Sequence, residues 1–502
     1  MVDAGGAAVM LRGFNVELKH FAPSWSVLGE NDIRKMAAAG ANCLRLVLDY
    51  RQFEPAPFSY DARSFALLDR VLGWCERHGL YAILDMHLAP GMQNTHDFVV
   101  HREGRASFWS SEAYQERFYA LWEEIARRYA GRTVVAGYDL LNEGTPPSAE
   151  DYRRIIGTAA ERIRRLDKRH MLIVEEAILE GWRKELVGLD DPNILYSIHF
   201  FYPPRFAFYI TTTDRPVSRY PGEMVSAGKK IGEARSSPLP PGRSERERGE
   251  WRQLRLTATP PEGADIVVVS IESPGGSGTV LVDDVELLVN GVPAELPAPL
   301  VANGSFEIDY PGFHWTLQGS CISVERGPAR TGAYALSFYR CAGSAAARSS
   351  PMPVKRGSYE LAAWYRAEGA DDDMRIVLAW HEREVVARID RQEIERQLAY
   401  ALDFKTRHKA PLFVGEFTAH ANPSLESIVN YLTDFLEIME REGLHWTFWN
   451  YYSEYPGVGI FTGDPLHCAN PAAWETLGRF LKRGRREKAG STVDYVTPLT
   501  KS

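Results

Sequence analysis

The first 200 residues alternate short apolar runs with segments in which apolar residues recur at helical spacing. Strands of a parallel sheet are buried on both faces and therefore appear as continuous apolar runs. Six such runs predict strands at 9–15, 43–48, 82–87, 134–142, 171–175 and 194–200. The alternation with helical segments indicates five or six βα units of a parallel α/β fold.

The segment between the fourth and fifth predicted strands has the clearest helical spacing. Ser148 follows a Pro-Pro pair and is placed as the N-cap of the helix. Apolar residues then recur at Tyr152, Ile155, Ile156, Ala159, Ile163 and Leu166. We expect this helix to pack outside the sheet.

The alternation resumes near the C-terminus. It predicts helices at 393–407, 424–441 and 472–482 and strands at 412–416 and 446–450. These segments complete eight units, so we expect an α/β fold of the (β/α)₈ type, a TIM barrel.

A long interruption, roughly residues 221–381, separates the two parts of this pattern. It far exceeds the typical connection of about 2–6 residues, so it is either a folded insert or a disordered segment. Residues 235–250 are rich in Pro, Gly and charge and predict a linker. Beyond Trp251, short alternating stretches predict an antiparallel β-sandwich: 254–256, 266–271, 280–288, 334–338, 359–364 and 376–380.

The length of 502 residues also favours more than one hydrophobic core. We therefore divide the chain into a first part of the barrel at 1–224, an inserted sandwich at 225–385 and a second part of the barrel at 386–502.

The net charge of −8 provides no basic field to attract phosphates. Nucleic acids and anionic membranes are therefore unexpected partners, and a neutral substrate is expected. The N-terminus lacks the pattern of a secretory signal, and no run of 18 apolar residues occurs. We expect a cytoplasmic protein or the mature form of a secreted one; the sequence does not define the oligomeric state.

The five cysteines show no metal-binding spacing, and their odd number argues against a complete disulfide framework. Cys321 and Cys341 can still form a pair. No metal or other cofactor is expected.

Two carboxylates, Glu143 in VVAGYDLLNEG and Glu416 in PLFVGEFTAH, each follow an apolar strand. In a parallel barrel the carboxyl ends of the strands meet at one rim, so we expect these residues to converge. Other strands bring polar or aromatic side chains to the same rim: Asn15, Arg45, His87, Asn142, His199 and Trp449. A structural ion pair would explain either carboxylate alone, but together they fit glycoside hydrolysis, which needs two carboxyl groups and no metal.

The chain resembles glycoside hydrolase family 5, the cellulase and mannanase family of retaining (β/α)₈ enzymes. The resemblance covers most of the barrel and rests on LRGFN at 11–15, LRLVL at 44–48, DMHLAPGMQN at 85–94, DLLNEG at 139–144, YSIHF at 196–200, FVGEF at 413–417 and TFWNYY at 447–452.

The resemblance implies that Glu143 is the acid/base, that Glu416 is the nucleophile, and that Asn142 binds the sugar 2-hydroxyl. Arg45 should lie beside Glu416 and keep it ionised, while a less solvated Glu143 retains its proton. We expect His87 and His199 to contact sugar hydroxyls, with a satisfied core histidine as the alternative for each.

Aromatic residues at the rim are the second part of the expected site. Trp449 ends the eighth strand and is expected to stack on a sugar. The loop tryptophans Trp25, Trp109 and Trp182 either line further subsites or pack under their loops.

The chain departs from the family where a tyrosine usually follows the sixth-strand histidine by two residues. Phe201 stands there, and the next residue is Tyr202. Either Tyr202 contacts the nucleophile through a one-residue slip, or that contact is lost.

The insert resembles jelly-roll carbohydrate-binding modules through NGSFE at 303–307, Trp315, TGAYALSF at 331–338, YELAAWYRAEG at 359–369 and VDDVELL at 282–288. The last motif belongs to the final strand of such modules but precedes the others here. A circularly permuted sandwich is therefore expected, and it either binds carbohydrate, walls off the site or stabilises the fold.

The sequence thus predicts a retaining β-glycosidase acting on β-1,4-glucans, mannans or their oligosaccharides. The alternative is a non-catalytic carbohydrate-binding protein, and transglycosylation would use the same covalent intermediate. Glucose versus mannose specificity and endo versus exo action are not determined by residue type.

Overall fold

The computed structural model describes residues 9–21, 27–94, 107–207, 219–238, 249–276, 278–293, 304–307, 315–319, 321–341, 343–368, 374–421, 423–454 and 457–486. Eight parallel strands close into a barrel in the order β1-β2-β3-β4-β5-β8-β21-β22. Their bounds are Arg12–Glu17, Cys43–Asp49, Tyr81–Leu88, Val135–Asp139, Met171–Glu175, Ile194–Phe200, Leu412–Phe417 and His445–Phe448. The predicted barrel is confirmed.

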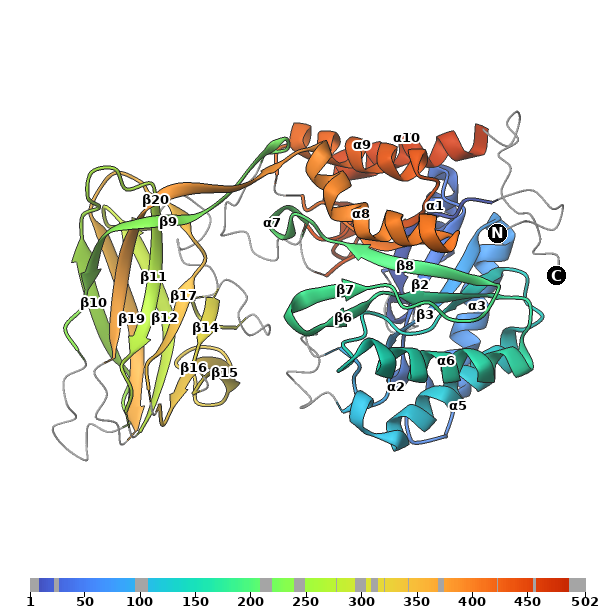
Figure 1. Cartoon of the computed structure of the whole chain (residues 1–502), viewed down its shortest axis with the longest axis horizontal. Coiled ribbons are helices and arrows are strands. Elements are labelled where there is room, and N and C mark those ends of the chain that lie inside the picture. Colours follow the sequence, from blue (N-terminus) through green and yellow to red (C-terminus); the bar gives the residue numbers. More distant parts are fainter. Residues whose placement is uncertain are drawn as a thin grey trace.

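Among the described residues, seven longer helices are present, and they cover the outside of the barrel (Figure 1). They are α1 (Glu30–Ala39), α3 (Ala62–His78), α5 (Glu112–Tyr129), α6 (Ala149–Leu166), α8 (Arg391–His408), α9 (Leu425–Arg441) and α10 (Pro471–Arg486). Ser148 caps α6 by accepting a hydrogen bond from the Asp151 amide at 3.1 Å, as predicted. The apolar face of α6 is buried through Tyr152, Ile155 and Ile163, which attaches the helix to the barrel.

Short elements join these units. They are α2 (Tyr50–Phe53), α7 (Pro204–Ala207), the 3₁₀ turns Leu18–Phe21, Phe108–Ser110 and Glu180–Trp182, and the strands β6 (Ala177–Leu179), β7 (Arg183–Glu185), β23 (Phe461–Thr462) and β24 (His467–Cys468). Within the described residues, the unit after β5 contains the β6–β7 hairpin instead of a helix. No helix in this described part of the chain combines the length and apolar character needed to cross a lipid bilayer.

The interruption forms two antiparallel sheets. One has the order β10-β19-β12-β16-β15 with β13 beside β12, and the other has the order β14-β17-β11-β20-β9 with β18 beside β11. The bounds are β9 Gly222–Arg235, β10 Arg252–Ala258, β11 Ile266–Ser273, β12 Thr279–Val289, β13 Val292–Pro293, β14 Trp315–Gln318, β15 Ile322–Arg326, β16 Tyr334–Tyr339, β17 Ala345–Ser349, β18 Met352–Pro353, β19 Tyr359–Glu368 and β20 Arg375–Ile389.

The two sheets share one hydrophobic core, to which Leu254, Val269, Leu336 and Trp380 contribute. A disulfide joins Cys321 to Cys341, which confirms that pairing. The expected likeness to a permuted carbohydrate-binding module stays a prediction. Asn303, the first residue of the NGSFE motif, lies outside the described residues.

Strand β9 was not predicted. It pairs with β20 from Gly222 opposite Ile389 to Arg235 opposite Val377, and the two form a ribbon between barrel and sandwich (Figure 1). Its sequence, GEMVSAGKKIGEAR, is weakly apolar because most of its residues are only partly buried. The predicted boundaries at 224/225 and 385/386 fall inside this ribbon, and most of the predicted linker, residues 239–248, lies outside the described part.

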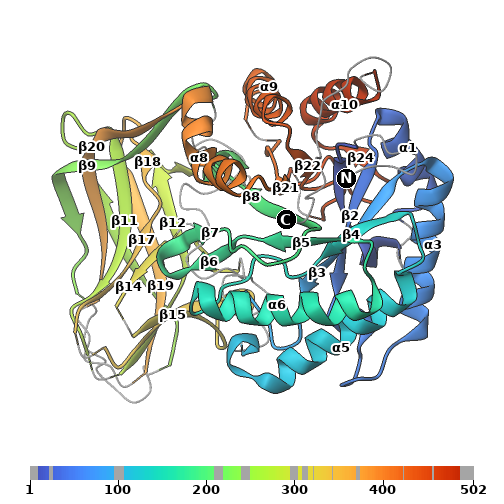
Figure 2. The same ribbon diagram turned by 45° about the vertical axis from the view of Figure 1, so that its right-hand side comes forward.

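The sandwich lies on the side of the barrel where the parallel strands end. The carboxyl end of β8 leads through α7 toward β9 and the sandwich, and the views in Figures 1 and 2 agree on this arrangement. Residues that follow the barrel strands therefore project toward the insert.

Candidate active site

Arg45 on β2 is fully buried at the centre of a polar network. Its guanidinium group donates hydrogen bonds to five side chains: Asn15 Oδ1 at 3.0 Å, Asp139 Oδ2 at 2.8 Å, Asn142 Oδ1 at 3.0 Å, Glu175 Oε1 at 2.7 Å and Glu416 Oε1 at 2.6 Å. Asp85 Oδ1 lies 3.0 Å from Nη2. This one cation contacts side chains from five other barrel strands or from the residues that follow them. These contacts allow the charge to be buried, because a buried charge is tolerated only when it is paired.

Glu416 on β21 is almost fully buried. Gly415, the residue before it, leaves space for neighbouring side chains. A Cβ at Gly415 would lie 2.7 Å from Ser197 Oγ and 3.1 Å from His199 Nε2. Both separations are too short for an unshifted side chain. Glycine at position 415 therefore lets His199 lie close to Glu416.

Glu143 follows β4, which ends at Asp139 and not at the predicted residue 142. Its φ of 44° lies in the left-handed region, which residues other than glycine rarely adopt. Its amide donates to Glu175 Oε2 at 2.8 Å, and its carboxylate accepts from Asn94 Nδ2 at 3.2 Å. The chain beyond β4 is thus bent so that Glu143 points back over the barrel.

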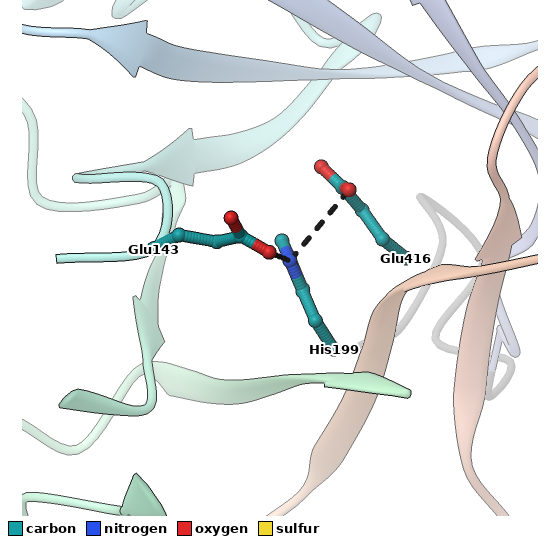
Figure 3. A group of neighbouring side chains, drawn as sticks. All are labelled: Glu143, His199 and Glu416. Atoms are coloured by element: carbon teal, nitrogen blue, oxygen red, sulfur yellow. Dashed lines mark hydrogen bonds and ion pairs between the residues drawn. The ribbon is translucent and has the colours of Figure 1, made fainter. Parts of the chain in front are cut away.

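His199 on β8 lies between the two predicted catalytic glutamates (Figure 3). Its Nδ1 is 2.8 Å from Glu143 Oε1 and 3.7 Å from Glu416 Oε2. Its Nε2 is 3.3 Å from Glu175 Oε1. One oxygen of each glutamate and a ring nitrogen of His199 all lie within 4.8 Å of one another. The structure therefore brings Glu143 and Glu416 together.

His87 and Trp449 form a second edge of the site. Their rings stack with centroids 5.4 Å apart and an angle of 7° between planes. His87 Nδ1 is 2.8 Å from Asp85 Oδ2 and 4.0 Å from Glu416 Oε1. Burial lowers the pKa of His87, but Asp85 and Glu416 outweigh it and raise the pKa to about 9. His87 therefore carries a positive charge beside Glu416 at neutral pH.

The expected order of the two carboxyl pKa values is wrong for this structure. The side chain of Glu143 is 29% exposed and that of Glu416 only 5%, so burial acts more strongly on Glu416. Burial raises the pKa of Glu416 more than His199, Arg45 and His87 lower it. For Glu143, burial is offset by His199, and the pKa falls below its usual value. Arg45 is less effective for Glu416 than predicted because three other carboxylates share it.

The suggested role of Tyr202 at the nucleophile is also wrong. Its hydroxyl donates to Glu393 Oε1 on α8 at 2.9 Å, away from Glu416. Phe201, at the family's tyrosine position, places its ring edge toward His199 with centroids 6.1 Å apart. The phenol contact to the nucleophile is therefore absent from these two residues.

The loop tryptophans separate into different environments. Trp109 donates from Nε1 to the Gln93 carbonyl at 2.7 Å, which favours the packing alternative for this residue. Trp182 in the β6–β7 turn is 58% exposed. Trp25 lies outside the described residues.

Three buried acids of the site were missed from the sequence: Asp85, Asp139 and Glu175. Each lies within or at the end of a barrel strand, in DMH, YDLL and VEEA. The same strand-end signal that identified Glu143 and Glu416 would have found Glu175. Asp139 ends β4 in the structure but falls inside the longer predicted strand 134–142, and Asp85 lies within β3, so neither was marked by a predicted strand end.

Two groups of side chains in the described residues have the spacing of metal ligands. One is Glu143, His199 and Glu416, and the other is Asp85, Asp139 and Glu175. The second group already surrounds the Arg45 guanidinium, whose positive charge stands where a metal cation would have to bind. Burial and neighbouring carboxylates also raise the pKa of Asp139 well above its usual value.

Comparison with known families finds a match in the first part of the chain. A sequence model described as Cellulase (glycosyl hydrolase family 5) matches residues 2–227. The matched segment contains the first six barrel strands, together with Arg45, His87, Asn142, Glu143 and His199.

Individual relatives match shorter segments. A β-xylosidase of Phanerodontia chrysosporium is 38% identical over 138 residues, 27% of this chain and 29% of its own length. Endoglucanase C of Acetivibrio thermocellus is 28% identical over 206 residues, 40% of this chain and 57% of its own. The chain thus covers about three fifths or less of the length of these relatives.

Among solved structures, Thermotoga maritima Cel5A in complex with mannotriose is 14% identical at a TM-score of 0.48, with 93% of this chain and 97% of that chain covered.

Proposed function

We propose that this chain is a member of glycosyl hydrolase family 5, whose model matches residues 2–227, and that it is a retaining β-glycosidase that hydrolyses β-linked glucosides or mannosides. The observation that carries the proposal is the approach of Glu143 and Glu416 across His199, with one oxygen of each within 4.8 Å. Retaining glycosidases hold their carboxyl groups about 5–5.5 Å apart, whereas inverting enzymes separate them by about 6.5–9.5 Å to admit a water. The short separation favours retention.

In the proposed reaction, Glu143 donates its proton to the glycosidic oxygen while Glu416 attacks the anomeric carbon. The bond to the leaving group breaks and a covalent glycosyl-enzyme forms. Glu143 then removes a proton from water, which attacks the same carbon and releases Glu416. Arg45 and Asn15 fix the position of Glu416, because Arg45 Nη1 contacts both residues.

In this proposal, Glu143 and His199 share one proton before the substrate binds. Burial lowers the pKa of His199, but Glu175, Glu416 and Glu143 outweigh it and raise the pKa well above the usual value. The imidazolium thus contacts a Glu143 carboxylate at 2.8 Å. We propose that this proton passes to Glu143 when a glycosidic oxygen arrives.

The other rim residues bind the sugar in this proposal. Asn142 hydrogen-bonds the 2-hydroxyl, His87 and His199 contact further hydroxyls, and the half-buried Trp449 offers an aromatic face. The names of the relatives, endoglucanase and cellodextrinase among them, support glucosides before mannosides as substrates.

The test is turnover by the full chain with aryl β-glucoside, β-mannoside and β-cellobioside and with soluble glucan and mannan. Glu416→Ala should abolish release of aglycone and of reducing ends. Glu426→Ala is the matched control, because it removes an exposed carboxylate from the first turn of α9. Binding of polysaccharide without turnover of any substrate would refute the proposal and support a carbohydrate-binding protein.

The division into barrel and insert, with a sandwich that binds carbohydrate, walls off the site or stabilises the fold, is part of the same proposal. Its test is retention of the Glu416→Ala chain on insoluble glucan and mannan, compared with a Glu416→Ala chain that also carries substitutions on the sandwich surface.

A further inference from the structure

Glu175 at the end of β5 has no role in the chemistry described above, yet it contacts three members of the site. It is 1% exposed. Its Oε2 accepts from the Glu143 amide at 2.8 Å, and its Oε1 accepts from Arg45 Nη2 at 2.7 Å. The same Oε1 lies 3.3 Å from His199 Nε2. A buried carboxylate is costly unless its oxygens are satisfied, and here both are used.

The contact through Oε2 acts on the backbone of Glu143. At a φ of 44° the residue has a strained conformation that persists only where its surroundings hold it. The Glu143 amide points at Glu175, so Glu175 fixes the direction in which the Glu143 side chain leaves the chain.

The contact through Oε1 acts on the ring of His199. Nδ1 of this ring faces Glu143, and Nε2 faces Glu175. A carboxylate this close to an imidazole nitrogen favours the protonated form of the ring through its charge. Glu175 is therefore linked to Glu143 twice, once through the backbone and once through His199.

We propose that Glu175 is a positioning residue that orients Glu143 and keeps His199 protonated toward it. The proposal rests on the proposed glycosidase function for its catalytic meaning, but the charge of His199 is a property of the protein alone.

Other charged groups around this pair do not replace Glu175. They are Arg45, Asp85, His87, Asp139, Glu143, Glu176, Lys184 and Glu416. Glu176 and Lys184 reach His199 only through its backbone, at 3.2 Å to the amide and 2.6 Å to the carbonyl. Glu416 is 3.7 Å from Nδ1, on the other side of the ring from Glu175. Burial raises the pKa of Glu175, but His199 and Arg45 lower it to about 2, so it is ionised at neutral pH.

The test compares three full-length variants. Glu175→Gln keeps the shape of the side chain and removes its charge, and Glu175→Asp keeps the charge at a shorter reach. Asp167→Asn is the matched control at the opposite end of β5. The buried Asp167 lies between α6 and the start of β5, where it bonds His170 and accepts from the Tyr138 hydroxyl at 2.7 Å.

The first measurement is the titration of His199 by NMR, assigned with His199→Gln. In Glu175→Gln, His199 should lose its proton at a pH lower by about one unit or more, because an adjacent negative charge has been removed. Glu175→Asp should retain most of the wild-type titration, and Asp167→Asn all of it. An unchanged His199 titration in Glu175→Gln, or an equal shift in Asp167→Asn, overturns the proposal.

The second measurement is the pH profile on the best substrate. Glu175→Gln should lower kcat by about ten- to hundredfold, with KM little changed, and should move the basic limb of kcat/KM to lower pH. A higher KM with an unchanged pH profile of kcat/KM would also overturn the proposal. If the wild type is inactive while the His199 titration shifts as expected, the proposed function fails and the assignment of Glu175 stands.

Discussion

Replacing Arg45 with methionine would remove the one cation that holds the strand ends together. The methionine fills much of the same space without a charge, so packing around position 45 is largely kept. Asp139, Glu175 and Glu416 would each lose a hydrogen bond of 2.6–2.8 Å to the guanidinium. The variant therefore isolates the electrostatic contribution of the network.

The expected loss is about 3–5 kcal/mol at neutral pH, the usual cost of removing one partner from a buried ion pair. This is a large fraction of the roughly 5–15 kcal/mol that stabilises a typical domain. The loss should depend on pH. Without Arg45 the folded-state pKa of Glu175 rises from about 2 and that of Glu416, already raised, rises further, so the loss is largest at neutral pH. It shrinks as pH falls through the raised pKa values and is gone only below the wild-type pKa of Glu175.

Hydrogen exchange under native conditions measures this loss locally, because it reports the opening free energy of each segment. Peptides from β2 and β3 should lose protection relative to wild type at pH 7, and the difference should be smaller but still present at pH 4.5. Peptides from β11 and β12 in the sandwich serve as an internal reference. Arg77→Met is the matched control. Arg77 contacts Glu30 at 2.9 Å but is 57% exposed, and surface pairs contribute about 0–1 kcal/mol.

A loss below about 1 kcal/mol for Arg45→Met, or a loss that grows toward pH 4.5, would refute this account of the network. The first result would mean that the carboxylates are stabilised without Arg45. The second would mean that their protonation is not linked to it.

Three further predictions concern single positions. Gly415→Ala should lower kcat by about a hundredfold, because a Cβ would lie 3.1 Å from His199 Nε2. Gly478→Ala on α10 is the control and should not change turnover, because a Cβ there would have nothing within 4 Å. Equal activities of the two variants would contradict the steric argument. Cys321→Ser/Cys341→Ser should destabilise the sandwich by about 3 kcal/mol for a loop of this length, measured by exchange in β16, with barrel exchange unchanged as the check. Tyr202→Phe should retain wild-type kcat, since the hydroxyl bonds Glu393, and a large loss would restore the predicted contact to the nucleophile.

Most of the barrel could be predicted from the sequence because its strands are buried on both faces. The predicted bounds of β5 and β8 match the structure, since both are continuous apolar runs ended by polar residues. Strand β9 was missed for the opposite reason: as part of a two-stranded ribbon it buries little, and its residues show no firm alternation.

The site was predictable in position but not in electrostatics. Glu143 and Glu416 were found because each follows an apolar strand. The order of their pKa values depends on how one arginine is divided among four carboxylates and on the 29% and 5% exposure of the two side chains. The bond of Tyr202 to Glu393 likewise depends on how α8 packs beside the rim, which no local pattern encodes.

The most direct test of the central claim is to trap the covalent intermediate with a 2-fluoro aryl β-glucoside and to digest the labelled protein for mass spectrometry. The account predicts that the peptide carrying Glu416 gains the mass of one fluorosugar and that Glu416→Ala gains none. A label on another residue, or aglycone release without any labelled protein, would contradict the assignment of Glu416 as the nucleophile of a retaining glycosidase.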